Sequence, residues 1–209
     1  MTLAHVPARA VPFLVACAAA CRVPPRADDS VLLPPDAFAG IPFGGEGRIE
    51  RTGDALVLHA GNPLTGVRCD LPDLPRDDYE LSLEATRVRG GDFFCALTFP
   101  YRDAHCTLVV GGWGGALVGL SCLDGEDAAH NDTTTYFAFD DGRPYRVTLR
   151  VGGGRIRASI DGTRVVDAEV AGRQVSVRAD LAATVPLAVC SYATTARIRD
   201  VRLRRTDAR

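Results

Sequence analysis

Apolar and polar residues alternate with a period of two from about residue 46 to the end of the chain. The pattern is clearest in Tyr79–Val88, where leucines alternate with Glu80, Ser82 and Glu84. Successive side chains of a β-strand point to opposite faces, so this alternation predicts a strand with one buried face. The chain is therefore expected to consist of one strand after another.

Two segments, Phe93–Phe99 and Cys106–Val110, are more continuously apolar, which is typical of strands buried on both faces. Alternation predicts further strands over six ranges: Arg146–Val151, Arg155–Ile160, Arg164–Val170, Val175–Ala179, Leu187–Tyr192 and Arg197–Arg204. Asp161-Gly162 predicts a tight hairpin turn, because both residues tolerate positive φ. No segment of twelve or more residues shows an apolar stripe at helical spacing. An all-β sandwich or barrel follows as the expected architecture.

The composition fits one soluble globular domain with a tail, since the 209 residues are 46% hydrophobic and 24% charged. The 24 basic residues are all arginine. Together with 26 acidic residues they give a net charge of -2. No nucleic-acid partner is expected from that balance. In Arg197–Arg204 the arginines stand among apolar residues, which is typical of a solvated strand face, and a polyanion site is the alternative.

The first 21 residues predict an export signal. Met1–Ala10 contains no acidic residue, and the apolar run Val11–Cys21 follows it. That run is shorter than the roughly 20 residues that span a bilayer and suits a signal peptide. Residues 14–17, Leu-Val-Ala-Cys, are similar to a bacterial lipobox and predict a lipid anchor on Cys17, with Cys21 as a weaker match.

We therefore expect an exported protein of the cell envelope or periplasm, lipid-anchored at Cys17. A plain signal peptide cut near the alanine-rich stretch and a translation start placed too early are the alternatives. Residues 22–35 are rich in Pro, Arg and Asp and predict an unstructured tether before a domain over residues 36–205.

Five cysteines remain in the predicted domain: Cys69, Cys95, Cys106, Cys122 and Cys190. None stands in a C-x-x-C spacing, so structural zinc is not expected. Cys95 and Cys106 flank a predicted hairpin turn near residues 100–104. Oxidation could join these two in an exported protein, and free, buried thiols are the alternative.

The segments Gly90–Pro100 and His105–Gly115 resemble the central hairpin of the 3-keto-disaccharide hydrolase domain family. The resemblance continues through Val118–Ser121, Asp124–Asp127 and Asn131–Thr134 to Ala196–Leu203, and covers roughly residues 36–205. It implies a single-domain, concanavalin A-like jelly roll that is secreted or lipid-anchored. It also implies a carbohydrate or glycoside as the partner.

Two functions stay open at this point. One is cleavage of a 3-keto-glycoside or glycoside in a groove on one sheet, and the other is non-catalytic binding of a glycan or protein at the cell surface. Retaining glucanases place two carboxylates about 5–5.5 Å apart, but Glu80 and Glu84 would stand about 13 Å apart along their strand. A 3-keto sugar permits another route, in which one base removes the proton beside the ketone and one group stabilises the enolate.

The loop of residues 124–132 concentrates groups that could serve this chemistry. Asp127 is a candidate catalytic base, and Asp124 and Asn131 are candidate substrate ligands. The same oxygen atoms suit calcium, although the EF-hand spacing is absent. A solvated acidic loop without a ligand is the alternative.

Trp113 lies between two glycine pairs, where a ligand can approach closely, and is a candidate stacking platform for a sugar. A packed Trp is the alternative. His105 and Asp92 are further candidate catalytic groups. The alternatives are that His105 is a hydrogen-bonded structural residue and that Asp92 only forms a turn. The short predicted strand Leu117–Leu123 joins Trp113 to residues 124–132, so we expect both to border one groove.

Overall fold

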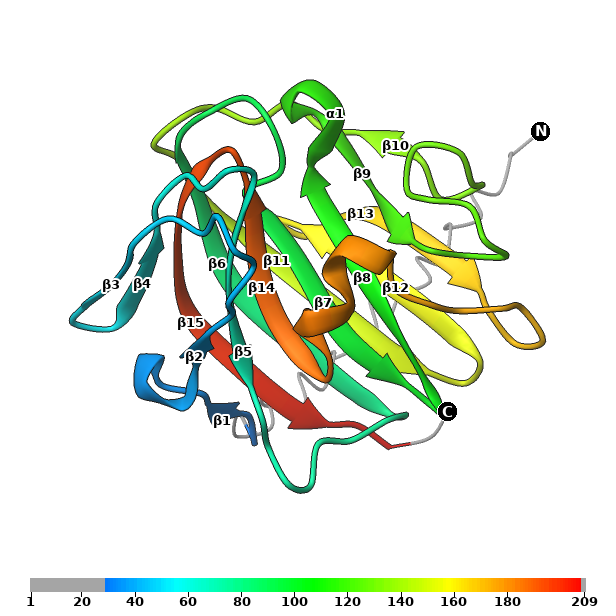
Figure 1. Ribbon diagram of the computed structural model, residues 1–209. Helices are drawn as coiled ribbons and strands as arrows, with labels where there is room; N and C mark the ends of the chain where they lie inside the picture. Colours follow the sequence, from blue (N-terminus) through cyan, green and yellow to red (C-terminus); the bar gives the residue numbers. More distant parts are fainter. Residues whose placement is uncertain (1–28, 208–209) are drawn as a thin grey trace, which may run out of the picture.

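The computed structural model describes residues 29–207, which form two antiparallel sheets packed face to face (Figure 1). Sheet A has the strand order β13-β12-β11-β6-β15-β4-β3, with β1 paired to β15. Sheet B has the order β10-β9-β8-β7-β14-β5-β2. The predicted all-β jelly-roll sandwich is confirmed.

Sheet A consists of β1 (Val31–Leu32), β3 (Ile49–Thr52), β4 (Ala55–Leu58), β6 (Tyr79–Arg89), β11 (Pro144–Gly152), β12 (Arg155–Ile160), β13 (Thr163–Glu169) and β15 (Thr195–Arg205). Sheet B consists of β2 (Ala39–Gly40), β5 (Leu64–Cys69), β7 (Cys95–Tyr101), β8 (Ala104–Gly111), β9 (Leu117–Ser121), β10 (Thr135–Tyr136) and β14 (Leu187–Tyr192). Three short helical elements join them: η1 (Pro35–Ala37), α1 (Gly112–Gly115) and η2 (Ala179–Thr184). Within residues 29–207, none of the helices has the length and apolar character needed to cross a membrane.

The period-two pattern appears in the structure as strands with alternating burial. In β6 and β11 every second side chain is buried in the core between the sheets. The turn at Asp161-Gly162 has φ values of 49° and 79°, which confirms the predicted hairpin. The predicted strand Val175–Ala179 is wrong. Val175 makes only an isolated bridge to Leu123, and η2 begins at Ala179.

Four aromatic side chains meet in the core near the end of the sandwich that carries α1: Phe94, Phe137, Phe139 and Tyr145. Tyr145 is fully buried, and its ring packs edge-on against Phe139 with centroids 5.0 Å apart. The Tyr145 hydroxyl accepts a hydrogen bond of 2.7 Å from the backbone N–H of Asp140. Aromatic burial of this kind is a large contribution to stability.

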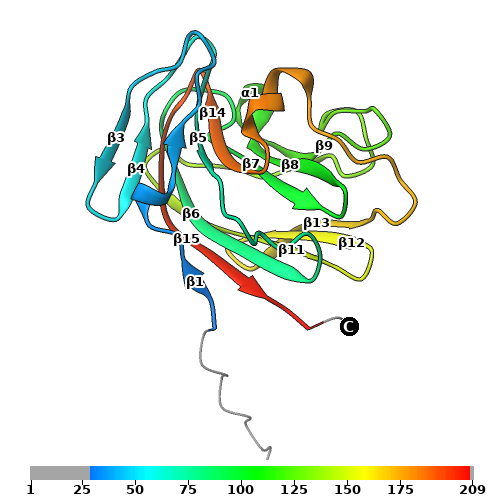
Figure 2. The same ribbon diagram turned by 60° about the horizontal axis from the view of Figure 1, so that its bottom comes forward.

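The start of the fold lies earlier than predicted. Val31–Leu32 pairs with β15, as Figure 2 shows near the C-terminus, and Leu33 is buried in the core. The expected tether is therefore wrong for residues 31–35, which belong to sheet A or to the turn before β2. The predicted lipobox and Cys17 lie outside the described residues.

All five described cysteines are free and buried. In the β7–β8 ladder Cys95 pairs with Val110 and Cys106 pairs with Phe99, so the two thiols stand about 13 Å apart along the ladder at the usual strand rise. A disulfide between them is therefore excluded. Burial raises the pKa of both thiols to about 12, and both act as small hydrophobic residues.

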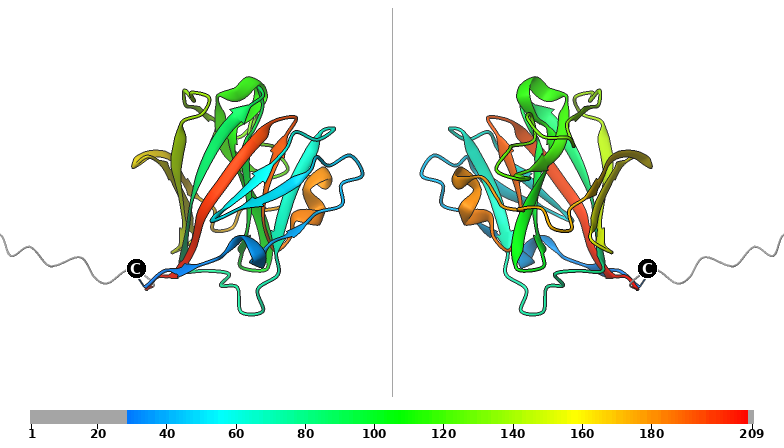
Figure 3. Two further views of the ribbon diagram at one scale, coloured as in Figure 1. Left: turned by 90° about the vertical axis from the view of Figure 1, so that its left-hand side faces the viewer. Right: turned by 90° about the vertical axis from the view of Figure 1, so that its right-hand side faces the viewer.

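The outer face of sheet B is covered by the chain itself. Thr98 of β7 is hydrogen-bonded through its hydroxyl to Thr107 of β8 at 2.9 Å and to Thr184 of η2 at 2.8 Å. Leu181 of η2 packs in a second apolar cluster with Ala96, Ala188 and Cys190 of the same face. In the side views of Figure 3, η2 (orange) lies outside sheet B, on the side away from sheet A.

Candidate functional site

The turn between β8 and β9 presents Trp113 to solvent. Gly111, Trp113 and Gly114 have φ values of 79°, 47° and 90°, a left-handed conformation that bulky residues rarely adopt. A Cβ atom on Gly111 would lie 2.8 Å from the Phe94 ring, so the turn is fixed against the aromatic core. Trp113 keeps 41% of its surface exposed, so it is not a core residue.

Arg178 connects Trp113 to the predicted site loop. Its guanidinium carbon lies 5.9 Å from the centre of the Trp113 ring, within the range of a cation–π contact. Two hydrogen bonds of 3.1 Å to Asp180 orient the same guanidinium. Backbone hydrogen bonds between Ser176 and Cys122 place this segment beside the end of β9. Sequence reasoning missed Arg178, because nothing in its local sequence distinguishes it from the other arginines.

A shallow hollow of about 750 Å³ lies next to Arg178. Its lining comes from the loop after β9 and from the segment before η2: Cys122, Gly125, Glu126, Asp127, His130, Ser176, Val177, Arg178, Ala179 and Asp180. The hollow thus contains Asp127 and Arg178, and Trp113, which does not line it, adjoins them through its contact with Arg178. We call the hollow and Trp113 together the Trp113–Asp127 surface.

Asp127 and His130 form a hydrogen-bonded pair within the hollow. His130 Nδ1 lies 2.7 Å from Asp127 Oδ1, which also accepts the backbone N–H of Ala129 at 2.9 Å. Burial by itself would raise the pKa of Asp127, but the bonds from His130 and Ala129 and the nearby charge of Arg178 lower it. An ionised Asp127 only accepts hydrogen bonds, so Nδ1 donates and Nε2 of the exposed His130 ring stays available.

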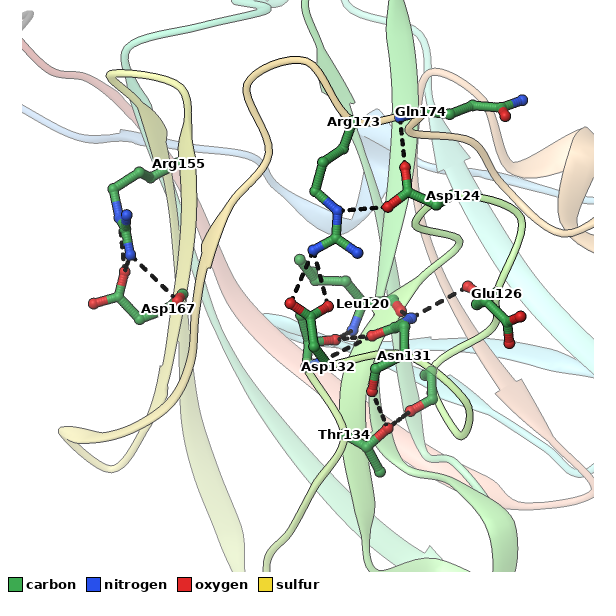
Figure 4. Close-up of polar contacts among 12 residues, drawn as sticks. Leu120, Asp124, Glu126, Asn131, Asp132, Thr134, Arg155, Asp167, Arg173 and Gln174 are labelled. Atoms are coloured by element: carbon green, nitrogen blue, oxygen red, sulfur yellow. Dashed lines mark hydrogen bonds and ion pairs between the residues drawn. The ribbon is translucent and has the colours of Figure 1, made fainter.

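Asp124 and Asn131 hold the loop together (Figure 4). Asp124 accepts hydrogen bonds from Arg173 Nε at 2.7 Å and from the Gln174 N–H at 2.9 Å. Both lower the pKa of Asp124, with the Arg173 bond the larger cause. Asn131 Nδ2 donates to the carbonyl oxygens of Leu120 and Asp127, both at 2.8 Å. The side chains of the two predicted substrate ligands are therefore already hydrogen-bonded to other parts of the protein.

Arg173 also takes the position that a cation would need between the acidic groups of the loop. Its guanidinium binds Asp124 and, through NH1, both oxygens of Asp132 at 2.8 and 3.0 Å. In the described part of the chain, no group of three or more His, Cys, Asp or Glu side chains is placed to hold a metal ion. Residues 29–207 thus contain no cluster of side chains that could serve as the calcium site suggested by the sequence.

Asp92 and His105, the other two candidates, are not part of the hollow. Asp92 accepts the N–H of Phe93 at 2.7 Å and lies beside Gly112, close to the turn of Trp113. His105 lies at the opposite end of β8, about 20 Å along the strand from Gly111. Burial, and then the charge of Arg76, lower the pKa of His105. His105 does not line the hollow, although its strand runs beside the end of β9, where Thr107 pairs with Ser121.

The sequence matches no protein-family model, and no curated protein matches it. Solved structures are similar in fold. A protein of unknown function with a galectin-like fold from Bacillus subtilis superposes with a TM-score of 0.59 and 13% identity, covering 83% of this chain and 91% of that one. The Crh5 transglycosylase in complex with NAG gives a TM-score of 0.58 and 11% identity, covering 86% and 85%.

Domain 4 of AbnA, a GH43 extracellular arabinanase from Geobacillus stearothermophilus, in complex with arabinotriose, gives a TM-score of 0.52 and 14% identity over 82% of this chain and 84% of that one. At these identities the similarity concerns the fold alone. The chain therefore has a jelly-roll fold similar to the galectin-like fold of the first of these structures. Which activity this fold carries depends on its surface residues, since jelly rolls serve many functions.

Proposed function

We propose that the Trp113–Asp127 surface binds a carbohydrate. The observation that carries this proposal is Trp113, which a left-handed turn holds exposed and in contact with Arg178 beside the hollow. An aromatic face complements the apolar C–H face of a pyranose, and the guanidinium and carboxylate groups of Arg178 and Asp127 can bind its hydroxyl groups. A flat ring flanked by hydrogen-bonding groups suits a sugar better than a purely apolar ligand.

Two of the structures with a similar fold support the proposal by their contents. One holds arabinotriose and the other holds NAG. The export signal expected in residues 1–21 would carry such a surface to the cell envelope, where glycans are accessible. The resemblance to the 3-keto-disaccharide hydrolase domain family, which no matching family model supports, would imply the same class of ligand.

Replacing Trp113 by alanine tests the proposal. We expect the binding free energy for the oligosaccharide to weaken by about 1–3 kcal/mol, the usual loss for a stacking platform, with only a small change in melting temperature because Trp113 lies outside the core. Calorimetric titration with arabino-, gluco- and N-acetylglucosamine oligosaccharides measures the affinity. Tyr136→Ala is the matched control, because it removes an aromatic side chain that is 72% exposed and, within the described residues, makes no cation–π contact with Arg178. Equal affinities of wild type and Trp113→Ala, or no binding to any of these sugars, would refute the site.

A second candidate function is cleavage of a 3-keto-glycoside at the same surface. The Asp127–His130 pair favours it, because an oriented imidazole with a free Nε2 is a general base. His130 would take the proton from the carbon beside the ketone, and the electron pair of that C–H bond would form the enolate. Arg178 would stabilise the enolate oxygen, and the aglycone would leave with the electrons of the glycosidic bond. The lowered pKa of Asp127 makes it a weak base, so in this route Asp127 orients His130.

The cleavage reaction predicts that the protein releases nitrophenol from a 4-nitrophenyl 3-keto-glucoside. His130→Ala should lower the turnover number by roughly 100-fold or more, while Asp127→Asn should shift the pH profile of the same reaction. Absorbance of released nitrophenol measures turnover. The parent glucoside, which lacks the ketone, is the control and should stay intact. A protein that binds sugar but releases no nitrophenol is a binding module, and the cleavage candidate is then wrong.

A further inference from the structure

The outer face of sheet A carries a row of hydroxyl groups that neither candidate function uses. Thr148 of β11 pairs in register with Ser82 of β6 on one side and with Ser159 of β12 on the other. Their strand neighbours point into the core, so the three short side chains lie on the solvent side. They form a flat polar floor across three adjacent strands.

Guanidinium groups surround this floor. Two adjoining hollows of about 640 and 330 Å³ share Glu80 and Thr148 in their linings. Their lining includes seven arginines: Arg146, Arg150, Arg155, Arg157, Arg164, Arg202 and Arg204. No aromatic or aliphatic residue of the described chain lines either hollow. We call the two hollows together the sheet A groove.

The arginines of the groove outnumber the carboxylates that they bind. Asp167 binds three of them, with N–O distances of 2.9 Å to Arg155, 3.3 Å to Arg157 and 2.7 Å to Arg164. These contacts lower the pKa of Asp167, above all the hydrogen bond from Arg155. A single carboxylate therefore neutralises only part of this group of guanidiniums.

The same imbalance continues across the sheet. Asp200 binds both Arg146 at 2.5 Å and Arg202 at 2.6 Å, and Glu80 binds Arg204 at 2.9 Å. Arg150 lies in register between Arg157 and Glu80.

Within residues 29–207 Arg150 has no ion-pair partner. Asp78 and Asp207 line the hollow on the β12 side, and Glu169 lies 3.5 Å from Arg155. With Glu80, Asp167 and Asp200, these three acids make six carboxylates against the seven arginines, so the groove keeps an excess of one positive charge.

We propose that the sheet A groove binds an acidic polysaccharide, one whose sugars carry carboxylate or sulfate groups. A planar guanidinium binds either group through two parallel hydrogen bonds. The hydroxyl groups of Ser82, Thr148 and Ser159 can donate hydrogen bonds to sugar hydroxyls and accept hydrogen bonds from them. Because these side chains are short, an extended polysaccharide can lie flat on the sheet. Nucleic acid fits less well, because the groove offers no aromatic ring for base stacking. The groove lies on the opposite sheet from the Trp113–Asp127 surface and does not depend on it.

Binding of the full-length protein to four polymers tests the groove: polygalacturonate for carboxylates, dextran sulfate for sulfates, uncharged dextran and single-stranded RNA. We expect binding to at least one acidic polysaccharide at near-physiological salt and none to dextran. Arg150→Ala should weaken that binding by roughly fivefold or more, with an unchanged melting temperature because no ion pair is broken. Thr148→Val, which keeps the side-chain shape and removes the hydroxyl, should also weaken it.

Arg89→Ala is the matched control, since this exposed arginine at the end of β6 lies outside the groove and removes the same charge. It should leave the affinity unchanged. Equal losses for Arg150→Ala and Arg89→Ala would show unspecific charge attraction and overturn the proposal. So would binding to RNA alone, or to no acidic polymer. If Trp113→Ala weakened the binding of the acidic polymer and Arg150→Ala did not, the polymer would bind at the Trp113–Asp127 surface. That result would also contradict the proposed binding in the sheet A groove.

Discussion

Tyr145→Ala is expected to lower the free energy of unfolding by about 3–5 kcal/mol, the usual loss for a truncated buried aromatic side chain. Tyr145 has no exposed surface and lies at the centre of the aromatic group, with ring centroids 5.0 Å from Phe139, 6.0 Å from Phe137 and 6.4 Å from Phe94. The melting temperature should fall by roughly 10 °C. Calorimetry or denaturant unfolding measures the change.

Tyr145→Phe separates the ring from its hydroxyl group. This variant keeps the packing but leaves the N–H of Asp140 without its acceptor. The free energy of unfolding should fall by about 1–3 kcal/mol. The alanine variant must therefore be the less stable of the two. Equal stabilities of Tyr145→Ala and wild type would show that the aromatic group does not pack as described.

Asn131→Ala is expected to lower the free energy of unfolding by about 2–4 kcal/mol and to abolish the sugar binding proposed for the Trp113–Asp127 surface. The side chain donates to Leu120 and Asp127 and accepts hydrogen bonds from the Thr133 N–H at 3.0 Å and the Thr133 hydroxyl at 2.6 Å. Alanine leaves the backbone and hydroxyl groups bonded to Asn131 without their partner. Each unpaired group lowers the free energy of unfolding by about 1–3 kcal/mol where water cannot replace the bond. The loop that carries Asp127 and His130 should then lose its conformation.

The control for this variant is Asn62→Ala, the same change at the other asparagine, whose side chain is exposed. Its unfolding free energy should stay within about 0.5 kcal/mol of wild type. Hydrogen exchange of the amides of residues 124–134 reports the state of the loop. An Asn131→Ala protein with wild-type stability and unchanged exchange in this loop would contradict the assigned role of Asn131.

The fold could be predicted from the sequence because its signal is local. In β6 and β12 each buried residue lies two positions from the next, and a strand with one buried face requires that spacing. The prediction was wrong at Val175–Ala179. There Val175 forms a single isolated bridge, and the 3-10 helix η2 begins at Ala179. Local alternation cannot show whether a neighbouring strand is present to complete a ladder.

The candidate site could be predicted only in part, because its contacts join distant segments. Trp113 and residues 124–132 were found from their composition, but Arg178 comes from a segment about fifty residues further on and reaches them only through the pairing of Ser176 with Cys122. Asp124 and Asn131 illustrate the opposite error. Their side chains have the chemistry of ligands, yet Arg173 and the loop backbone already occupy them. Only the three-dimensional contacts distinguish an available polar group from one already bonded.

The position of η2 also limits the shape of a ligand at sheet B. Because Leu181 and Thr184 lie against the outer face of β7 and β14, a long glycan cannot run across the strands there, and the hollow beside Arg178 is closed on that side by the protein's own backbone. An oligosaccharide bound at the proposed site would therefore have to extend away from η2, and it could not continue across the outer face of β7 and β14.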